Sequence, residues 1–297
     1  MRLAIVVFCA IAAGVLGARS SAAPTRSPTW AEVAAGLRPA LEPHSTNPCQ
    51  RGDVRCLDLV IAEMQRRDRT LAAACDHRGL FTRLYLRTTE AFKAAARAGR
   101  FRDRAAIVHF GAWFAHYHFQ ADDAWRTGRR AAVPRAWQAA FSAAARRSVH
   151  GLGDLLLGMN AHITRDLAVT VADLEHGQGR AVDPDFALFT KLIESKSVAA
   201  VAELAARFDP GLRLVQVPLT LGGRRSLGGL IGLWRTEAWR NGIALRDARG
   251  SARPAEARRI ESTARLRAGL IVAGTAYLPL VESSRSRDAY CAAHTGR

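Results

Sequence analysis

The sequence predicts an all-α protein, and three observations support this prediction. Apolar residues recur at intervals of three and four in almost every segment after residue 52, which is the spacing of a helix face. No stretch of useful length alternates apolar and polar residues as a half-buried strand does. Residues that begin or end helices separate the segments. We therefore expect one single-domain, disulfide-stapled bundle of about eight helices over residues 48–297, without a linker that would divide it.

The first half of the chain contains helices with recognisable ends. Residues 23–47 form an extended leading segment with a short helix at 30–38. Asp53, Asp76 and Asp103 can each accept hydrogen bonds from the free N–H groups of a following first turn. Pro134 suits the first turn of another helix. The helices predicted in this half cover residues 54–75, 77–98, 104–127 and 135–147.

The second half continues the helical pattern with two interruptions. A long helix from Gly151 to Leu174 contains the stretch LLLGMNAHITRDL. Asp183-Pro184 begins the next helix, and residues 215–225 form a loop or a short extended piece. The remaining helices are expected over 226–245 and 255–283, the last with a kink at Pro279.

The N-terminus resembles a secretory signal peptide. Arg2 precedes the apolar run LAIVVFCAIAAGVLGA, which is too short to span a bilayer. Small residues follow, so cleavage after Ala22 is expected, with Ala18 as an alternative. We expect residues 1–22 to be removed, a secreted protein, and no transmembrane segment in the mature chain.

The cysteines are consistent with export. Removal of Cys9 with the signal peptide leaves an even number, which suggests two disulfides in an exported chain. Three pairings are compatible with this number. We favour Cys49–Cys56, which closes a short loop, and Cys75–Cys291, which ties the C-terminal end to the core.

The formal charge of +17 suggests a nucleic-acid partner, but the distribution of the charges does not support one. Only Lys93, Lys191 and Lys196 are lysines among the 43 basic residues, an arginine bias typical of GC-rich coding. The arginines are spread along the chain, often beside Asp or Glu, without a basic arm or phosphate-binding loop. We expect no specific nucleic-acid binding, whereas a small-molecule ligand remains open.

The helix over 151–174 carries the main candidate site. His162 and Asp166 are four residues apart, so one can donate to the other or both can bind a shared ligand. The surrounding residues are apolar, which predicts burial, and a buried carboxylate needs a partner. A structural core network and a catalytic or ligand-binding pair, with Asn160 beside it, are the two interpretations.

Other candidates lie on three further helices. His109 and His116 share one face and would complete a divalent metal site with His162 and Asp166, although no cofactor motif is evident. His118 can pair with Asp122 at the next turn. The candidate binding residues are Arg87, Thr88, Tyr117, Trp137, Arg235 and Trp239. Arg87 can hold Asp166 or an acidic ligand, and Arg235 with Trp239 can form a stacked pair or line one pocket.

The motifs GLGDLLLGMNAHITRDL, NPCQRGDVRC, ACDHRGLF, LYLRTTEAF, PRAWQAAF and RTEAW occur in an order that resembles a bacterial family of domains of unknown function, family 5995. The resemblance covers most of residues 47–245. It implies that Trp137, Thr88, Arg235 and Trp239, with the three NAHI-helix residues, occupy characteristic positions of the family. Gly111 stands near a place where the family has an acidic residue, which implies an altered site or substitution by His109 or His116.

Two hypotheses of different classes follow. The first is an exported binding or structural domain in which the polar residues of the NAHI helix specify the core or a ligand pocket. The alternative is a secreted hydrolase, metal-assisted or not, that uses His162 as base or metal ligand and Asp166 to orient it. No nucleophile elbow or phosphate-binding loop supports a particular reaction.

Overall fold

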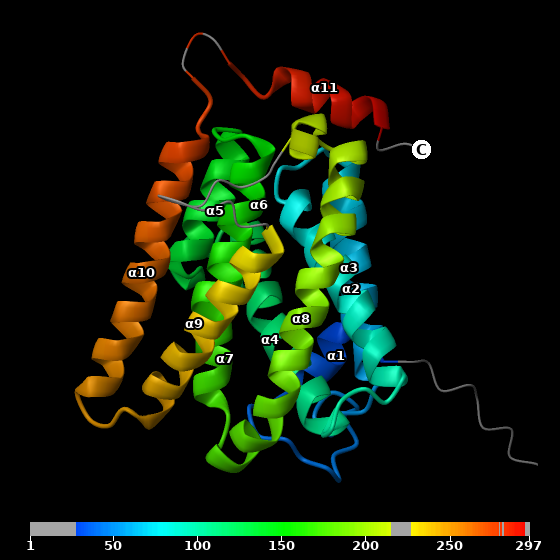
Figure 1. Cartoon of the computed structure of the whole chain (residues 1–297), viewed down its shortest axis with the longest axis vertical. Coiled ribbons are helices and arrows are strands. Elements are labelled where there is room, and N and C mark those ends of the chain that lie inside the picture. The colour runs from blue at the N-terminus through cyan, green and yellow to red at the C-terminus, as the bar shows by residue number, and fades with distance from the viewer. Residues whose placement is uncertain (1–27, 215–226, 279, 281, 295–297) are drawn as a thin grey trace, which may run out of the picture.

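The protein is an all-α bundle, as the sequence predicted (Figure 1). The computed structural model describes residues 28–214, 227–278, 280 and 282–294. Over these residues the helices are α1 (Trp30–Ala35), α2 (Cys56–Ala73), α3 (Gly79–Arg97), α4 (Arg104–Arg126), η1 (Arg130–Ala132), α5 (Arg135–Arg146), α6 (Gly151–Met159), η2 (Asn160–Leu167), α7 (Ala168–Asp173), α8 (His176–Arg207), η3 (Pro210–Leu214), α9 (Leu227–Asp247), α10 (Ala252–Thr275) and α11 (Arg285–His294). Counting α6, η2 and α7 as one helix and leaving out the 3₁₀ segments η1 and η3, the described residues form ten helices, against about eight expected.

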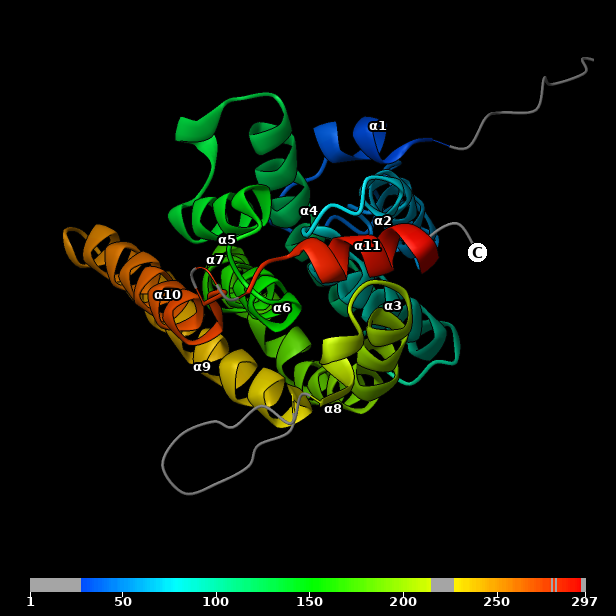
Figure 2. The same ribbon diagram turned by 90° about the horizontal axis from the view of Figure 1, so that it is seen from above.

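The helix formed by α6, η2 and α7 runs through the middle of the bundle, as the view from above shows (Figure 2). It packs against α3, α4, α5, α9 and α10. Its first half, GLGDLLLGM, is buried almost throughout, which explains why this segment is apolar on all sides. Residues of this central helix are therefore enclosed by the rest of the fold.

Both favoured disulfides are present, Cys49–Cys56 and Cys75–Cys291. The second attaches α11, which lies across one end of the bundle (Figure 1). Beside it, the buried His77 lies 3.0 Å from a carboxylate oxygen of Asp154 and 2.9 Å from one of Asp288. The guanidinium of Arg287 also donates to Asp154, so α11 is fixed by ion pairs as well as covalently.

Two predicted helix boundaries were wrong. The last long helix ends at Thr275 rather than residue 283, because the backbone turns extended at Ala276 and forms a bridge with Val149. A separate helix, α11, follows. Helix α8 begins at His176, before Pro184, which lies inside it. Pro184 and Arg180 are both exposed, so water can bind the Arg180 carbonyl that the proline leaves free.

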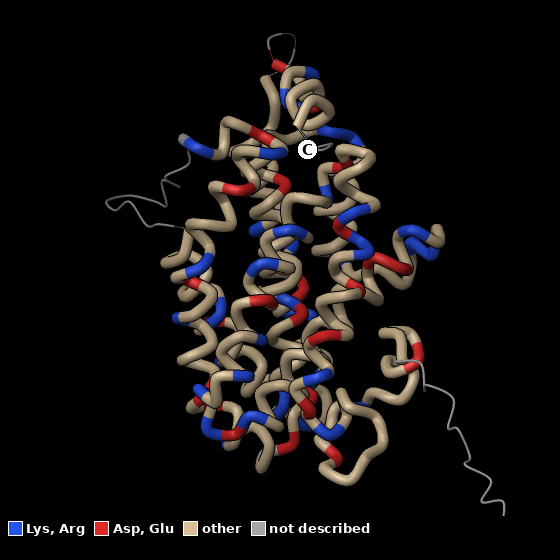
Figure 3. The backbone as a smooth tube through the Cα atoms, turned by 90° about the vertical axis from the view of Figure 1, so that its right-hand side faces the viewer, with Lys and Arg blue, Asp and Glu red and all other residues tan. Residues whose placement is uncertain are grey.

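Some predictions fall outside the described residues. These are the signal peptide over 1–22, the loop over 215–225 and the kink at Pro279. Within the described part of the chain, no helix has both the length and the apolar character needed to cross a bilayer. Lys and Arg are spread over most of the visible helices and interleaved with Asp and Glu (Figure 3).

Candidate functional site

The NAHITRDL stretch is wound as a π-helix, which the sequence did not reveal. Element η2 covers Asn160–Leu167 and is continuous with the α-helical turns on either side. Short π-helical insertions are rare and are found often at functional sites, where they change the direction of side chains. Asn160, His162 and Asp166 all lie on this segment and are at most 2% exposed.

Asp166 is a fully buried carboxylate that is surrounded by donors. One oxygen lies 2.8 Å from Trp137 Nε1 and 3.2 Å from His162 Nδ1. The other oxygen accepts a hydrogen bond of 2.9 Å from Arg165. Burial alone would lower the pKa of the Arg165 guanidinium. Its interactions with Asp166 and Glu261 have the larger effect, so the pKa is raised. Both oxygens of Asp166 therefore accept from donors, and the guanidinium of Arg165 supplies the opposite charge within the core.

The imidazole of His162 is stacked on an aromatic ring, and one of its nitrogens has no hydrogen-bond partner among the described residues. Its ring stacks on Phe114 with centroids 3.7 Å apart, and Tyr85 contacts the ring at 4.4 Å. Burial lowers the pKa of His162, although Asp166 opposes the shift, so the ring is neutral. With Nδ1 facing the carboxylate, the neutral ring keeps its proton there and presents a lone pair at Nε2. That Nε2 is buried and has no hydrogen-bond partner among the described residues.

Arg235 is a buried cation without a carboxylate partner. The residue is 1% exposed, and its Nε donates to Thr190 Oγ1 at 2.9 Å. Its guanidinium carbon lies 4.5 Å from the ring centre of Phe186 and 4.8 Å from that of Phe189. In the described part of the chain no ion pair involves Arg235, and Nη2 makes no hydrogen bond. Burial lowers the pKa of Arg235 to about 9.

Tyr85 connects these groups. Burial among the bundle helices raises the pKa of its hydroxyl, and the charge of Asp166 adds to the shift. The positive charge of Arg235 acts in the opposite direction on the pKa of Tyr85 and also lowers that of His162. Tyr85 retains partial surface exposure, and its hydroxyl has no hydrogen bond within the described residues. Two buried polar atoms without a hydrogen-bond partner among the described residues, His162 Nε2 and Arg235 Nη2, thus belong to side chains within electrostatic range of Tyr85 or of each other.

The predicted metal site is not formed. His109 Nε2 lies 2.9 Å from the Arg38 carbonyl, and its Nδ1 lies 2.9 Å from the side chain of Gln178. His116 lies toward the surface, 2.8 Å from Gln120. Neither histidine contacts His162 among the described residues. The histidine beside His162 is His118, and the centres of these two rings are 5.8 Å apart. Within the described ranges, no group of three or more His, Cys, Asp or Glu is arranged to hold a metal ion.

Several other candidates have separate partners. Asn160 Nδ2 donates to the Ala264 carbonyl on α10, away from the imidazole. Thr88 bonds back to its own helix, at the carbonyls of Leu84 and Tyr85. The Tyr117 hydroxyl donates to Asp173.

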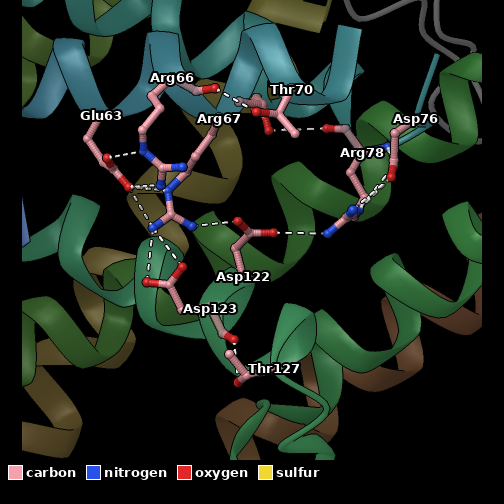
Figure 4. Close-up of polar contacts among 10 residues, drawn as sticks. Glu63, Arg66, Arg67, Thr70, Asp76, Arg78, Asp122, Asp123 and Thr127 are labelled. Atoms are coloured by element: carbon pink, nitrogen blue, oxygen red, sulfur yellow. Dashed lines mark hydrogen bonds and ion pairs between the residues drawn. The ribbon is translucent and has the colours of Figure 1, made fainter. Parts of the chain in front are cut away.

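The expected pairings of Arg87 with Asp166 and of His118 with Asp122 were wrong. Arg87 pairs with Glu203 and Glu90, because α8 brings Glu203 alongside α3, and so it does not reach Asp166. Asp122 does not pair with His118. Instead its two oxygens bind Arg67 and Arg78, which arrive from α2 and from the turn before α3 (Figure 4).

Arg235 and Trp239 do not stack on each other. Trp239 stacks on Phe186 with ring centres 4.4 Å apart, and Phe186 in turn covers Arg235. Trp239 lines a surface pocket with Thr190, whereas Arg235 lies behind these two residues.

Gly111 has a packing role in this chain. A Cβ atom at this position would lie 2.8 Å from Phe92, whose ring packs on Phe101 and Phe189 in the core. No described contact joins this group to His162. Gly111 therefore packs against Phe92 rather than against His162.

Tyr85 and Thr190 are the site residues that sequence reasoning missed. Tyr85 lies within LYLRTTE, where its spacing resembles that of an ordinary core aromatic residue.

A family model described as "Family of unknown function (DUF5995)" matches residues 57–274. The chain belongs to the DUF5995 family. The matched region includes Tyr85, His162, Asp166, Thr190 and Arg235, so the candidate site lies within the DUF5995 region. Comparison with curated proteins and with solved structures finds no match.

Proposed function

We propose that this DUF5995 protein is an exported binding domain that takes up a small anion at Arg235. The unpartnered buried guanidinium supports this proposal. A cation that is removed from water without a counter-charge is costly, and proteins generally pair such groups. A ligand carboxylate or phosphate would accept from Nη2 and supply the missing charge.

In this proposal the His162–Asp166 pair belongs to the scaffold. Asp166 is already neutralised by Arg165 and bonded to Trp137, and these contacts tie α5 to the central helix. Buried hydrogen bonds of this kind specify one packing of the core. Tyr85 contacts His162, with ring centroids 4.4 Å apart, and lies within electrostatic range of Arg235.

The replacement of Arg235 by methionine tests the proposal. In buffer without added anions, Arg235→Met should unfold at the same urea concentration as the wild type or at a higher one, because it removes an uncompensated charge. Wild-type protein should gain thermal stability from acetate or phosphate in proportion to occupancy, and the variant should gain less. Because the chain carries a charge of +17, any salt will stabilise it somewhat.

The exposed Arg258 provides the control for that general salt effect. Arg258→Met should keep the full response to acetate and phosphate. Equal responses in all three proteins, or a strongly destabilised Arg235→Met that shows the wild-type anion response, would refute a binding role for Arg235.

Export is part of the proposal. The apolar run after Arg2 and its small-residue ending support it. Disulfides persist in oxidising compartments, so the two bridges are consistent with this destination. Fractionation and N-terminal sequencing of the mature protein test it, with residue 23 expected first; an intact Met1 in the cytosol would contradict it.

A secreted hydrolase is the second candidate, and the free Nε2 of His162 favours it. A neutral imidazole fixed by a carboxylate at Nδ1 can take a proton from an attacking water at Nε2. The test is hydrolysis of p-nitrophenyl esters and phosphoesters by the wild type and by His162→Ala, together with metal analysis of both. Activity that disappears in a folded His162→Ala protein would support the hydrolase; activity that is absent or unchanged would exclude this role.

A further inference from the structure

The outer face of α10 carries exposed leucines. Leu266 and Leu270 are four residues apart on this helix and are 68% and 67% exposed. Leu278, just beyond the end of the helix, is 59% exposed. Of the six large apolar side chains that are exposed in the described part of the chain, four belong to residues 266–280. Single exposed leucines are ordinary, whereas a local group of them indicates an interaction surface.

No other described element covers this face of α10. The helix lies at the edge of the bundle when the protein is seen from the side and from above (Figure 1, Figure 2). Its buried residues, Ile260, Ala264 and Ala268, lie on the opposite side of the helix from the two leucines. A Cβ atom added at Gly269 would have no neighbour from another described part of the chain within 4 Å. The leucines therefore face open space.

A groove between α5 and α10 adds positive charge beside the leucines. Its lining consists mainly of short side chains and of four exposed arginines, which are Arg135, Arg146, Arg258 and Arg265. None of these four forms an ion pair with a described residue. The one acidic lining residue, Glu261, is already paired with Arg165. The groove therefore has an excess of positive charge.

The arginines and the leucines form neighbouring rows along α10. Arg258 and Arg265 are seven residues apart and share the side of the helix that lines the groove. Leu266 directly follows Arg265, so its side chain points about 100° further round the helix axis. A basic row beside an apolar row is the arrangement of helices that lie in a membrane interface.

We infer that this face of α10 rests on an anionic lipid surface. The leucines would lie at the boundary between headgroups and acyl chains, while the guanidinium groups of the groove bind the lipid phosphates. This surface is separate from Arg235, so the inference does not depend on the proposed binding of a small anion.

Charge favours lipid over a second copy of the chain as the occupant. Each copy carries a formal charge of +17, and unpaired arginines border the leucines on each. Association through α10 would therefore bring like charges together, which opposes binding. A negatively charged lipid surface complements the arginines and also accepts the leucines.

Sedimentation with vesicles in 0.15 M salt tests the inference. The processed protein is used, because the apolar run over residues 3–18 would itself bind a bilayer. Vesicles of equal parts phosphatidylglycerol and phosphatidylcholine should bind the wild type about tenfold or more tighter than vesicles of phosphatidylcholine alone. Similar binding to the two kinds of vesicle, or binding to neither, would overturn the inference.

Two double variants separate the apolar and the basic contributions. Leu266→Gln with Leu270→Gln should weaken binding to the anionic vesicles about tenfold or more, because two apolar side chains no longer enter the lipid. Arg146→Gln with Arg265→Gln should weaken it about 25-fold, since each arginine near an anionic surface contributes about fivefold. All four positions are exposed, so these variants should unfold at the wild-type temperature.

Matched variants on other faces control for the general adhesion of a basic chain. Val198→Gln with Leu233→Gln removes two exposed apolar side chains from α8 and α9. Arg69→Gln with Arg100→Gln removes the same charge from exposed positions outside the groove. Both should bind the anionic vesicles within about twofold of the wild type. Losses equal to those of the α10 variants would show that α10 is not the binding face.

Analytical ultracentrifugation without lipid tests the other occupant. The wild type should be monomeric at micromolar concentration. A dimer that dissociates in the variant with Leu266→Gln and Leu270→Gln would assign this face to a second copy and overturn the lipid surface.

Discussion

Trp137 and His162 meet at the same oxygen of Asp166, so side chains from α5 and the central helix form one buried unit. The two nitrogens lie 2.8 Å and 3.2 Å from that oxygen. The sequence offered these residues as separate candidates, and the bundle brings them together. The contributions of the individual donors to stability can be measured.

Trp137→Phe keeps a large aromatic side chain and removes only the indole donor. We expect the free energy of unfolding to fall by about 1–3 kcal/mol, because a buried carboxylate loses a hydrogen bond. Urea titration measures the change. Trp125→Phe is the control, since the indole nitrogen of Trp125 makes no hydrogen bond to any described residue, and it should cost less. Equal losses would mean that packing, rather than the hydrogen bond, explains the effect.

Asp166→Ala should be the more damaging change. It leaves Arg165, Trp137 and His162 facing a buried void, and breaking a buried ion pair costs about 3–5 kcal/mol. Asp123→Ala provides a comparison, because Asp123 also pairs with an arginine but its side chain is 47% exposed. That exposed pair should contribute at most about 1 kcal/mol. An Asp166→Ala protein as stable as Asp123→Ala would show that the central carboxylate has no structural role.

Stability should fall as the solution becomes mildly acidic. Burial lowers the pKa of His109, His118 and His162, and lowers that of His116 to about 4. From the ordinary value of 6.5 down to about 4, the unfolded chain binds more protons than the folded chain. The free energy of unfolding therefore decreases with pH across this window.

Urea titrations at several pH values within that window measure the slope. His118→Phe retains a buried ring and removes a titrating group, so the slope should become shallower. His44→Phe, at an exposed position, should leave the slope unchanged. A pH-independent wild type would contradict the assignment of neutral buried histidines.

The two disulfides should differ in their effect on stability. In the chain-entropy model the stabilisation grows with the length of chain closed, which gives about 5 kcal/mol for Cys75–Cys291 and about 2 kcal/mol for Cys49–Cys56. The bridged residues are 216 and 7 positions apart, respectively. Paired Cys→Ser variants, compared by thermal unfolding, test this order. A greater loss on removing the short bridge would indicate that native contacts, rather than loop length, decide.

The fold class was predictable because helix periodicity and capping residues are local properties of the sequence. The burial of His162 and Asp166 followed in the same way from the aliphatic residues around them. The π-helical winding of Asn160–Leu167 could not be predicted, because the same residues are compatible with the ordinary α-helical hydrogen-bond pattern. Tertiary packing decides between the two.

The helix face on which each candidate residue lies was easier to predict than the residue that it contacts. A helical wheel places His109 and His116 on one side of α4, but it does not say which helix lies opposite. The structure puts Arg38 and Gln178 against His109, and it places His118 beside His162. Similarly, Glu203 is 116 residues from Arg87, and only the position of α8 makes it the partner.

The bridge from Cys75 to Cys291 has a consequence for biosynthesis. During translation Cys75 is synthesised 216 residues before its disulfide partner, Cys291. Cys49 and Cys56 meet almost at once. Oxidation of the long bridge is therefore a post-synthetic step, and nascent chains caught before release should carry an alkylatable thiol at position 75.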